Sequence, residues 1–154
     1  MKIWDSYTID RLQYLHPSIR DAVRDVILEA QKQGIHLRIT QDGHYRSFDE
    51  QEQLHQDYLD GGPLAAPPGE SYHNYGLAVD VVPVNSQGQP EWDSDNWEQI
   101  ADIFAKHGFS WGFDLWGADK PHFQKTYGYD TQELLAILNN KQTIDSKYPN
   151  LGVA

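Results

Sequence analysis

Two short segments of this chain of 154 residues combine histidine and aspartate at spacings suited to metal-assisted hydrolysis. The first segment holds His73 and Asp80, and the second holds Asp119 and His122. A catalytic zinc ion takes three protein ligands, such as histidine nitrogens and carboxylate oxygens, and leaves a fourth position open. His73, Asp80 and His122 can supply that set. The chain has no cysteine, so histidine and carboxylate groups must hold any transition metal.

Two further charged residues suit the same reaction. Asp119 lies shortly before His122 with Pro121 between them, which favours a turn over a helix. A carboxylate so close to a zinc ligand is suited to be the general base that accepts a proton from water. Arg46 directly precedes Ser47, and its guanidinium could stabilise a developing oxyanion or bind a substrate carboxylate. In so acidic a chain, Arg46 could instead be a structural ion-pair partner.

The hydrophobic pattern predicts the elements that must position these residues. Apolar residues at helical spacing, with caps and stop residues, predict helices over residues 17–33, 47–60, 95–106 and about 130–138. Short apolar or alternating runs predict strands over residues 35–40 and 77–82, with extended pieces around 109–111 and 122–124. Asp80 then lies within a strand, on the face opposite Val79 and Val81, and Gly76 lets the chain turn after His73.

The order of these elements favours an α+β fold, with a small mixed, mainly antiparallel sheet packed with about four helices. The chain contains no internal repeat and no linker. We therefore expect a single domain over residues 1–154, with the motifs in a core of about residues 17–138.

Charge and hydropathy exclude several classes of partner. Lys and Arg number 12 against 23 Asp and Glu, and the resulting net charge of −11 disfavours nucleic acid as a partner. No run approaches the roughly 20 apolar residues that a membrane helix needs. The first residues also lack the apolar core of a signal peptide. We expect a monomer made in the cytoplasm without a signal peptide, with neither a nucleic-acid nor a membrane partner.

Three stretches together resemble a known family. Residues 71–80 have the form S-x-H-x-x-G-x-A-x-D, residues 119–123 have the form D-x-P-H-F, and residues 45–47 read Tyr-Arg-Ser. These stretches are similar to those of the zinc peptidases of the VanY and L-alanyl-D-glutamate endopeptidase group, which includes phage endolysin-like catalytic domains. That group shares its fold class with the D-alanyl-D-alanine peptidases and the hedgehog signalling domain.

The resemblance implies roles for particular residues. It implies one Zn²⁺ per chain, bound by His73, Asp80 and His122. It also implies that Asp119 is the general base and that Arg46 stabilises the transition state. The implied partner is the peptide stem of bacterial peptidoglycan, which the enzyme would hydrolyse.

The bond that is cut remains open between two reactions of the same family. Residues 45–51 and 72–76 look closer to the endopeptidases that cut between L-Ala and D-Glu. The short, proline-rich loop of residues 61–69 is more like that of VanY-type D-Ala-D-Ala carboxypeptidases, which are the alternative. A third hypothesis is a catalytically silent zinc-dependent module that binds cell wall or a protein.

Three residues are candidates for substrate contacts. Ser71 has no base paired with it by spacing, so we interpret it as a loop hydrogen-bonding residue or a substrate contact. Trp111 and Trp116 are candidates for core or cleft wall, and either could touch substrate. The protein would act on the cell wall if a lysis system released it, or on wall fragments in the cytoplasm.

Overall fold

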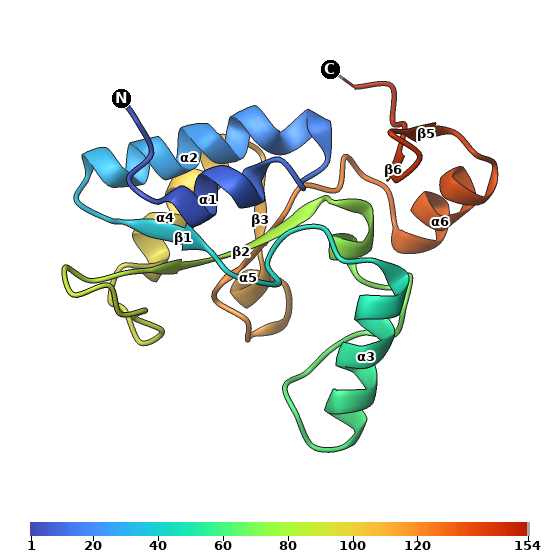
Figure 1. Ribbon diagram of the computed structural model, residues 1–154, viewed down its shortest axis with the longest axis horizontal. Helices are drawn as coiled ribbons and strands as arrows, with labels where there is room; N and C mark the ends of the chain where they lie inside the picture. The colour runs from blue at the N-terminus through green and yellow to red at the C-terminus, as the bar shows by residue number, and fades with distance from the viewer. Residues whose placement is uncertain (154) are drawn as a thin grey trace.

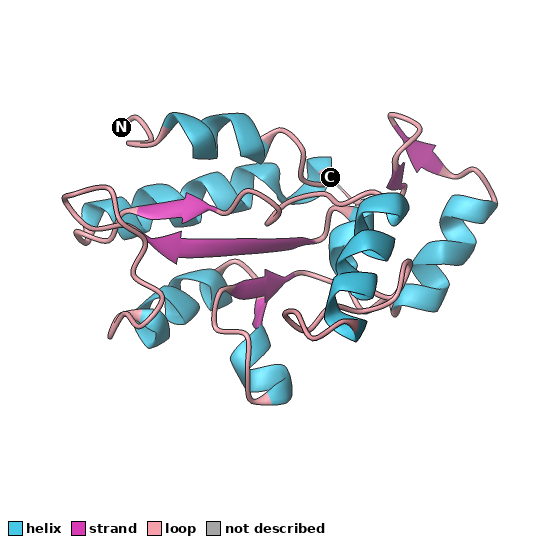
Figure 2. Cartoon of the chain, turned by 60° about the horizontal axis from the view of Figure 1, so that its bottom comes forward, coloured by secondary structure: helices cyan, strands magenta, loops and turns pink. Residues whose placement is uncertain are grey.

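The computed structural model describes residues 1–153 and shows a four-stranded antiparallel sheet at their centre (Figure 1). In spatial order the strands are β1 (Leu37–Ile39), β2 (Ala78–Pro83), β4 (His122–Gln124) and β3 (Ser110–Trp111). All neighbouring pairs are antiparallel, and Figure 2 shows β1 and β2 as arrows that point in opposite directions. The sheet is therefore wholly antiparallel rather than mixed. Its central pair, β2 and β4, places Asp80 directly opposite His122.

Three helices pack against this sheet and against one another. They are α1 (Ser6–Leu12), α2 (Arg20–Lys32) and α4 (Trp97–Lys106). The rings of Phe104 on α4 and Phe123 on β4 stack with their centroids 3.9 Å apart. Burial of the apolar stripes of these helices against the sheet supplies the main stabilisation of the fold. The shared core includes Val23, Val26, Ile27, Leu37, Ile39, Leu77, Val79, Val81, Ile100 and Ile103.

Helix α3 (Phe48–Leu59) extends away from the sheet (Figure 1). A capping box begins it, because Glu50 N donates to Ser47 Oγ and Ser47 N donates to Glu50 Oε1. Residues 60–69 return from the end of the helix as a loop, and Gln51 Nε2 donates to the carbonyl oxygen of Ala66 at 2.9 Å. We call residues 48–69 the α3 arm. The arm is attached to the rest of the protein beside Arg46, the residue before the cap.

The C-terminal part adds helix α6 (Thr131–Asn139) and a hairpin of β5 (Thr143–Ile144) and β6 (Tyr148–Pro149). The hairpin is bonded to the N-terminal part of the chain. His16 Nε2 lies 2.7 Å from the carbonyl oxygen of Pro149, and the Tyr148 hydroxyl donates to the carbonyl oxygen of Tyr14 at 2.8 Å. Residues more than 130 positions apart are thereby held together.

Several short elements were not expected from the sequence. They are α1, the five-residue helix α5 (Gly112–Trp116), the hairpin, and 3₁₀ turns at Pro17–Ile19 and Tyr72–Tyr75. The structure therefore has more helices within residues 1–153 than the four or so that the sequence predicts. The additional helices, α1 and α5, are too short to show a repeating apolar stripe. The helix expected from residue 95 begins at Trp97, with Asn96 at its N-cap. None of the helices within residues 1–153 is both long and apolar enough to span a membrane.

Candidate active site

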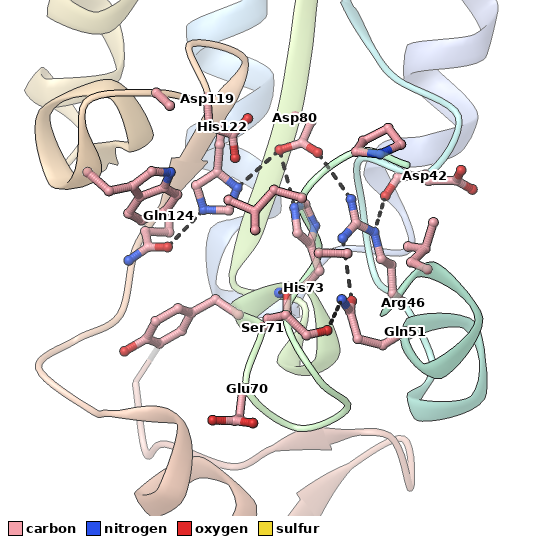
Figure 3. Close-up of a pocket in the computed structure, with 18 of the residues that line it drawn as sticks. Asp42, Arg46, Gln51, Glu70, Ser71, His73, Asp80, Asp119, His122 and Gln124 are labelled. Atoms are coloured by element: carbon pink, nitrogen blue, oxygen red, sulfur yellow. Dashed lines mark hydrogen bonds and ion pairs between the residues drawn. The ribbon is translucent and has the colours of Figure 1, made fainter. Parts of the chain in front are cut away.

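The three predicted metal ligands meet at one point. His73 comes from the 3₁₀ turn Tyr72–Tyr75, Asp80 from β2 and His122 from β4. Asp80 Oδ1 lies 3.2 Å from His73 Nε2 and 3.1 Å from His122 Nδ1, and the possible ligand atoms all lie within 4.8 Å of one another. Figure 3 shows both imidazole rings directed at the Asp80 carboxylate. Two histidine nitrogens and one carboxylate oxygen form a donor set that fits catalytic zinc.

Local backbone structure presents His73 to this point. Ser71 Oγ accepts a hydrogen bond from His73 N, and Gly76 ends the 3₁₀ turn with a φ of 72°. A Cβ atom at Gly76 would lie 2.6 Å from the backbone nitrogen of His16, so glycine is required for both conformation and space. His73 Nδ1 lies 2.8 Å from the carbonyl oxygen of His44, to which it donates, and this leaves Nε2 facing Asp80.

Sheet register presents the other two ligands. Asp80 N donates to the carbonyl oxygen of Gly43, and Asp80 O accepts from Thr40 N. The backbone of Asp80 is therefore held through both its N–H and its carbonyl group. His122 lies on the adjacent strand, and its Nε2 is 2.8 Å from Gln124 Oε1 on the side away from Asp80. His73 and His122 are both buried. We call His73, Asp80 and His122 the floor of the site.

The electrostatics of the floor favour a positive charge beside Asp80. Burial alone would raise the pKa of Asp80, but the charge of His73 and hydrogen bonds from both imidazoles hold it well below its usual range. Burial lowers the pKa of His73 despite the nearby carboxylate. Burial also opposes protonation of His122, yet the hydrogen bond to Asp80 and its charge raise the His122 pKa. An ionised carboxylate placed between two imidazole nitrogens is an arrangement that a bound cation would stabilise further.

Arg46 stands on the other side of Asp80 from His122 (Figure 3). Its backbone is fixed to the turn that carries His73, because Arg46 N donates to His73 O at 2.9 Å. Its guanidinium donates from Nε to Asp42 O, from Nη1 to Gln51 Oε1 and from Nη2 to Asp80 Oδ2, the last at 3.2 Å. The ion pair with Asp80 agrees with the structural interpretation of Arg46, and its place in the cavity lining is the one that the catalytic interpretation requires.

Asp119 occupies a turn before β4, as the sequence predicts. Its φ of 69° lies in the left-handed region, which aspartate and asparagine tolerate better than most residues. Asp119 O accepts from His122 N at 3.1 Å, which ties the turn to the floor. Loss of water around the carboxyl group, followed by the negative charge of Asp80, raises the pKa of Asp119. A raised pKa suits a group that must take up and release a proton.

A cavity of about 770 Å³ opens above the floor. Arg46, Asp119 and the floor residues line one part of it, and the α3 arm and helix α5 line the rest through residues that include Leu64 and Trp116. Leu64 is 73% exposed and Trp116 is 47% exposed, so the outer wall of the cavity is apolar and open to solvent. We call residues 63–66 and Trp116 the rim.

The predicted substrate-contact residues occupy three different environments. Ser71 lines the cavity while its hydroxyl caps the turn of His73. Trp116 lines the cavity, with its ring centroid 5.4 Å from that of His122.

Trp111 does not line this cavity, because its indole is buried against Phe123 and donates to the carbonyl oxygen of Lys120 at 2.7 Å. A core role therefore fits Trp111 better than a substrate contact.

Two glutamines that touch the site were given no role from the sequence. Gln51 is buried, accepts from Arg46 and donates to Ala66 O, so it joins the arginine to the α3 arm. Gln124 accepts from His122. Gln51 lies within residues 45–51, which resemble the endopeptidases, and Gln124 directly follows the stretch of residues 119–123. A polar residue at a position facing the core is the signal that could have marked both.

Comparison with known proteins places the chain in a family. Residues 65–125 match the family model Peptidase M15_4, described as D-alanyl-D-alanine carboxypeptidase. The peptidoglycan L-alanyl-D-glutamate endopeptidase CwlK of Bacillus subtilis is 34% identical over 124 residues, which cover 71% of this chain and 72% of CwlK. This chain belongs to the M15 peptidase family. The matched residues of this M15 peptidase include three members of the site, His73, Asp80 and His122.

Solved structures show the same fold. The Serratia marcescens L-Ala D-Glu endopeptidase ChiX superposes with a TM-score of 0.58 at 26% identity, over 79% of this M15 peptidase and 88% of ChiX. The D,D-pentapeptidase VanY from a VanB-type resistance cassette, solved as a variant with Zn(II), gives a TM-score of 0.57 at 18% identity. That comparison covers 72% of each chain and supports the fold alone.

Proposed function

We propose that this M15 peptidase is a zinc-dependent peptidoglycan L-alanyl-D-glutamate endopeptidase. The convergence of His73, Asp80 and His122 at the bottom of a cavity that also exposes Asp119 and Arg46 carries the proposal. The similarity to CwlK and ChiX, which are both named as endopeptidases for the L-Ala to D-Glu bond, supports the choice of substrate. The partner is the stem peptide of peptidoglycan, and the enzyme acts on cell wall or on fragments of it.

In this proposal His73, Asp80 and His122 hold one zinc ion per chain. Zinc supplies Lewis-acid chemistry, which polarises a carbonyl group and makes water acidic enough to lose a proton near neutral pH. Asp119 accepts that proton as the water oxygen bonds to the carbonyl carbon of L-Ala. The C–N bond to D-Glu then breaks, and Asp119 delivers the proton to the departing amine. The raised pKa of Asp119 suits both halves of this transfer.

Arg46 supplies positive charge at the same point. A guanidinium has five N–H donors, and the three contacts of Arg46 occupy one donor on each of its nitrogens. Two donors thus remain for the oxygen on which negative charge develops. Because the backbone and three nitrogens of Arg46 are already bonded, these donors are held in place before substrate arrives.

The rim supplies the binding surface for the rest of the stem peptide. Trp116 and Leu64 present exposed apolar area on either side of the cavity, and Ser71 lines the wall between the floor and the arm. Exposed aromatic area is a common anchor for a ligand in such a cleft. We propose Trp116 as the main contact and Ser71 as a minor one.

The second candidate, a D-Ala-D-Ala carboxypeptidase, is favoured by the description of the family model that the chain matches. A carboxypeptidase must recognise the free terminal carboxylate of its substrate. Among the described residues that line the cavity, Arg46 is the only arginine or lysine, and it already pairs with Asp80. The cavity wall also carries the acidic residues Asp42, Asp57 and Glu70. Because D-Glu also carries a carboxyl group outside the bond that is cut, this charge balance is common to both candidates, and the similarity to CwlK and ChiX supports the endopeptidase.

Mass spectrometry of stem peptides and whole peptidoglycan after incubation with the zinc-loaded protein tests the proposal. New products that begin with D-Glu are expected, from substrates with free and with amidated C-termini alike. Loss of one terminal D-Ala, blocked by amidation, would assign the carboxypeptidase instead. If zinc binds at one per chain and no product forms, the silent binding module becomes the conclusion. Asp119→Asn is the control that distinguishes this enzyme from a contaminating hydrolase.

A further inference from the structure

The two histidines of the floor are held in place by different kinds of group. The Nδ1 of His73 donates to a backbone carbonyl oxygen, that of His44, at 2.8 Å. The Nε2 of His122 instead meets a side chain, with Gln124 Oε1 at 2.8 Å. A backbone acceptor is present whatever residue occupies position 44, whereas the acceptor for His122 depends on the identity of residue 124.

Strand geometry gives Gln124 this position. His122 and Gln124 are two residues apart on β4, so their side chains project from the same face of the sheet. Gln124 pairs with Ala78 of β2, and Ala78 has a small side chain that leaves room for the amide to reach along the strand. Gln124 is 9% exposed, and Figure 3 shows its amide bonded to the His122 ring on the side away from Asp80.

The chemistry of the two groups fixes the direction of this hydrogen bond. When His122 Nδ1 offers its lone pair toward Asp80 and a shared metal ion, the neutral ring carries its proton on Nε2. A protonated Nε2 needs an acceptor, and the amide oxygen is the only acceptor on the glutamine side chain. The amide NH₂ group would face the ring proton unfavourably, so the oxygen must turn toward His122, as the structure shows.

We infer that Gln124 is a positioning residue for the metal site: its amide oxygen holds His122 in the tautomer and orientation that present Nδ1 to zinc. This inference rests on the proposed zinc site. Outer-shell acceptors of this kind fix ring orientation and raise the basicity of the ligand nitrogen. Gln124 acts through His122 and is not itself assigned a contact with the reacting atoms.

Zinc affinity of the full chain, measured by competition with a chromogenic chelator, tests the inference. Gln124→Met keeps the approximate length and volume but removes the acceptor, and it should weaken zinc binding about 10–100-fold. Gln124→Glu keeps an acceptor and adds charge, and it should bind zinc at least as tightly as the native chain. Gln99→Met is the matched control, because Gln99 lies on α4 and hydrogen-bonds only to Gln33 among the described residues.

A second measurement separates positioning from a general loss of structure. In the zinc-loaded native protein, long-range ¹H–¹⁵N spectra should show a proton on Nε2 of His122 and none on Nδ1. A proton on Nδ1 would overturn the inference even if Gln124→Met failed to fold. Equal zinc affinity in Gln124→Met and the native chain would also overturn it, as would loss of affinity in Gln124→Glu. Failure of the native chain to bind zinc would instead contradict the proposed site.

Discussion

The floor and the rim of the cavity are built by opposite means. His73 and His122 are buried, and each is bonded through both ring nitrogens to groups on strands, turns or backbone. Leu64 and Trp116 on the rim are exposed and belong to a loop and to a five-residue helix. The floor therefore holds the groups that need fixed geometry, while the rim can change residues without disturbing the fold. In the proposed enzyme, the floor of the cavity carries out the reaction, and the rim contacts the rest of the substrate.

The largest expected effect is the loss of a floor histidine. His73→Ala removes a proposed ligand, so zinc affinity should fall by more than the 10–100-fold typical of an outer-shell change, and hydrolysis should disappear. His55→Ala is the matched control on the α3 arm, where His55 Nδ1 hydrogen-bonds, among residues 1–153, only to the carbonyl oxygen of Ala65. Chelator competition and stem-peptide hydrolysis measure both effects. Equal zinc affinity in the two variants would contradict the ligand assignment.

The next effect is at Asp119, which touches the reaction and not the metal in this proposal. Asp119→Asn removes the base but suits the left-handed φ of 69°, so the turn should be preserved. We expect kcat to fall about 10²–10⁴-fold with zinc still bound at one per chain. Steady-state kinetics and metal analysis check this. A variant that keeps the native kcat would remove Asp119 from the mechanism.

Arg46→Lys should have a somewhat smaller effect. Lysine keeps the positive charge but cannot reproduce contacts with Asp42, Gln51 and Asp80 while retaining donors for substrate. We expect kcat to fall about 10²–10³-fold, with a smaller change in KM. A change confined to thermal stability, with native kcat, would leave Arg46 as a structural ion-pair partner only.

Two tryptophans test whether the rim can be changed with less loss of stability than the core around the floor. Trp111 is 8% exposed and stacks on Phe123, so Trp111→Ala should lower the free energy of unfolding by about 3–5 kcal/mol. Trp116 is 47% exposed, and Trp116→Ala should lower that free energy by a smaller amount, about 1 kcal/mol. Trp116→Ala should instead raise KM several-fold. Denaturant unfolding and steady-state kinetics of both variants measure these effects. A larger loss of stability in Trp116→Ala than in Trp111→Ala would contradict the assignment.

The smallest expected effect is a pH dependence of stability at His16, away from the cavity. Burial lowers the pKa of His16, and the charge of Arg20 acts in the same direction, although the bond to Pro149 O opposes them. Because the folded pKa lies below the unfolded value, this stabilisation is complete above about pH 6.5 and is lost as the pH falls.

His16→Gln isolates that contribution. Glutamine can retain an N–H donor toward Pro149 O but does not titrate. Denaturant unfolding of the zinc-free protein at pH 8 and pH 5.5 should show a smaller pH difference in this variant than in the native chain. An unchanged difference would exclude His16 as a source of acid sensitivity.

The sequence alone predicted the side chains of the floor more completely than their surroundings. His73, Asp80 and His122 were identified because their residue types and spacing suit one metal ion, and the structure brings them together. A shared metal ion requires the strands of Asp80 and His122 to be neighbours, as they are, but the order of the other strands could not be derived, because strands of two to six residues carry no signal for it. The environments of Trp111 and Trp116 depend on that order, so the sequence could not distinguish them.

Short elements were missed for a related physical reason. Helices α1 and α5 have seven and five residues, and isolated helices of that length are unstable, so tertiary contacts form them. Asp5, which caps α1 through Thr8 and pairs with Arg38 of β1, shows such a contact. The capping boxes of α3 and α6 were predictable because all their bonds are local. The roles of Gln51 and Gln124 were not predicted, because an amide can bond to many neighbours and only the folded geometry shows that these two meet Arg46 and His122.

The contact between the hairpin β5–β6 and residues 14–16 has a consequence for how the protein is made. Gly76, which ends the turn of His73, packs between the backbone of His16 and the Tyr148 ring, so the turn is enclosed by residues from both ends of the chain. Contacts between residues so far apart in the sequence are slow to form, because closing the long loop between them costs entropy. During translation, therefore, the turn that presents His73 cannot be locked until Tyr148 and Pro149 have left the ribosome, and the nascent chain should acquire tight metal binding only after that point.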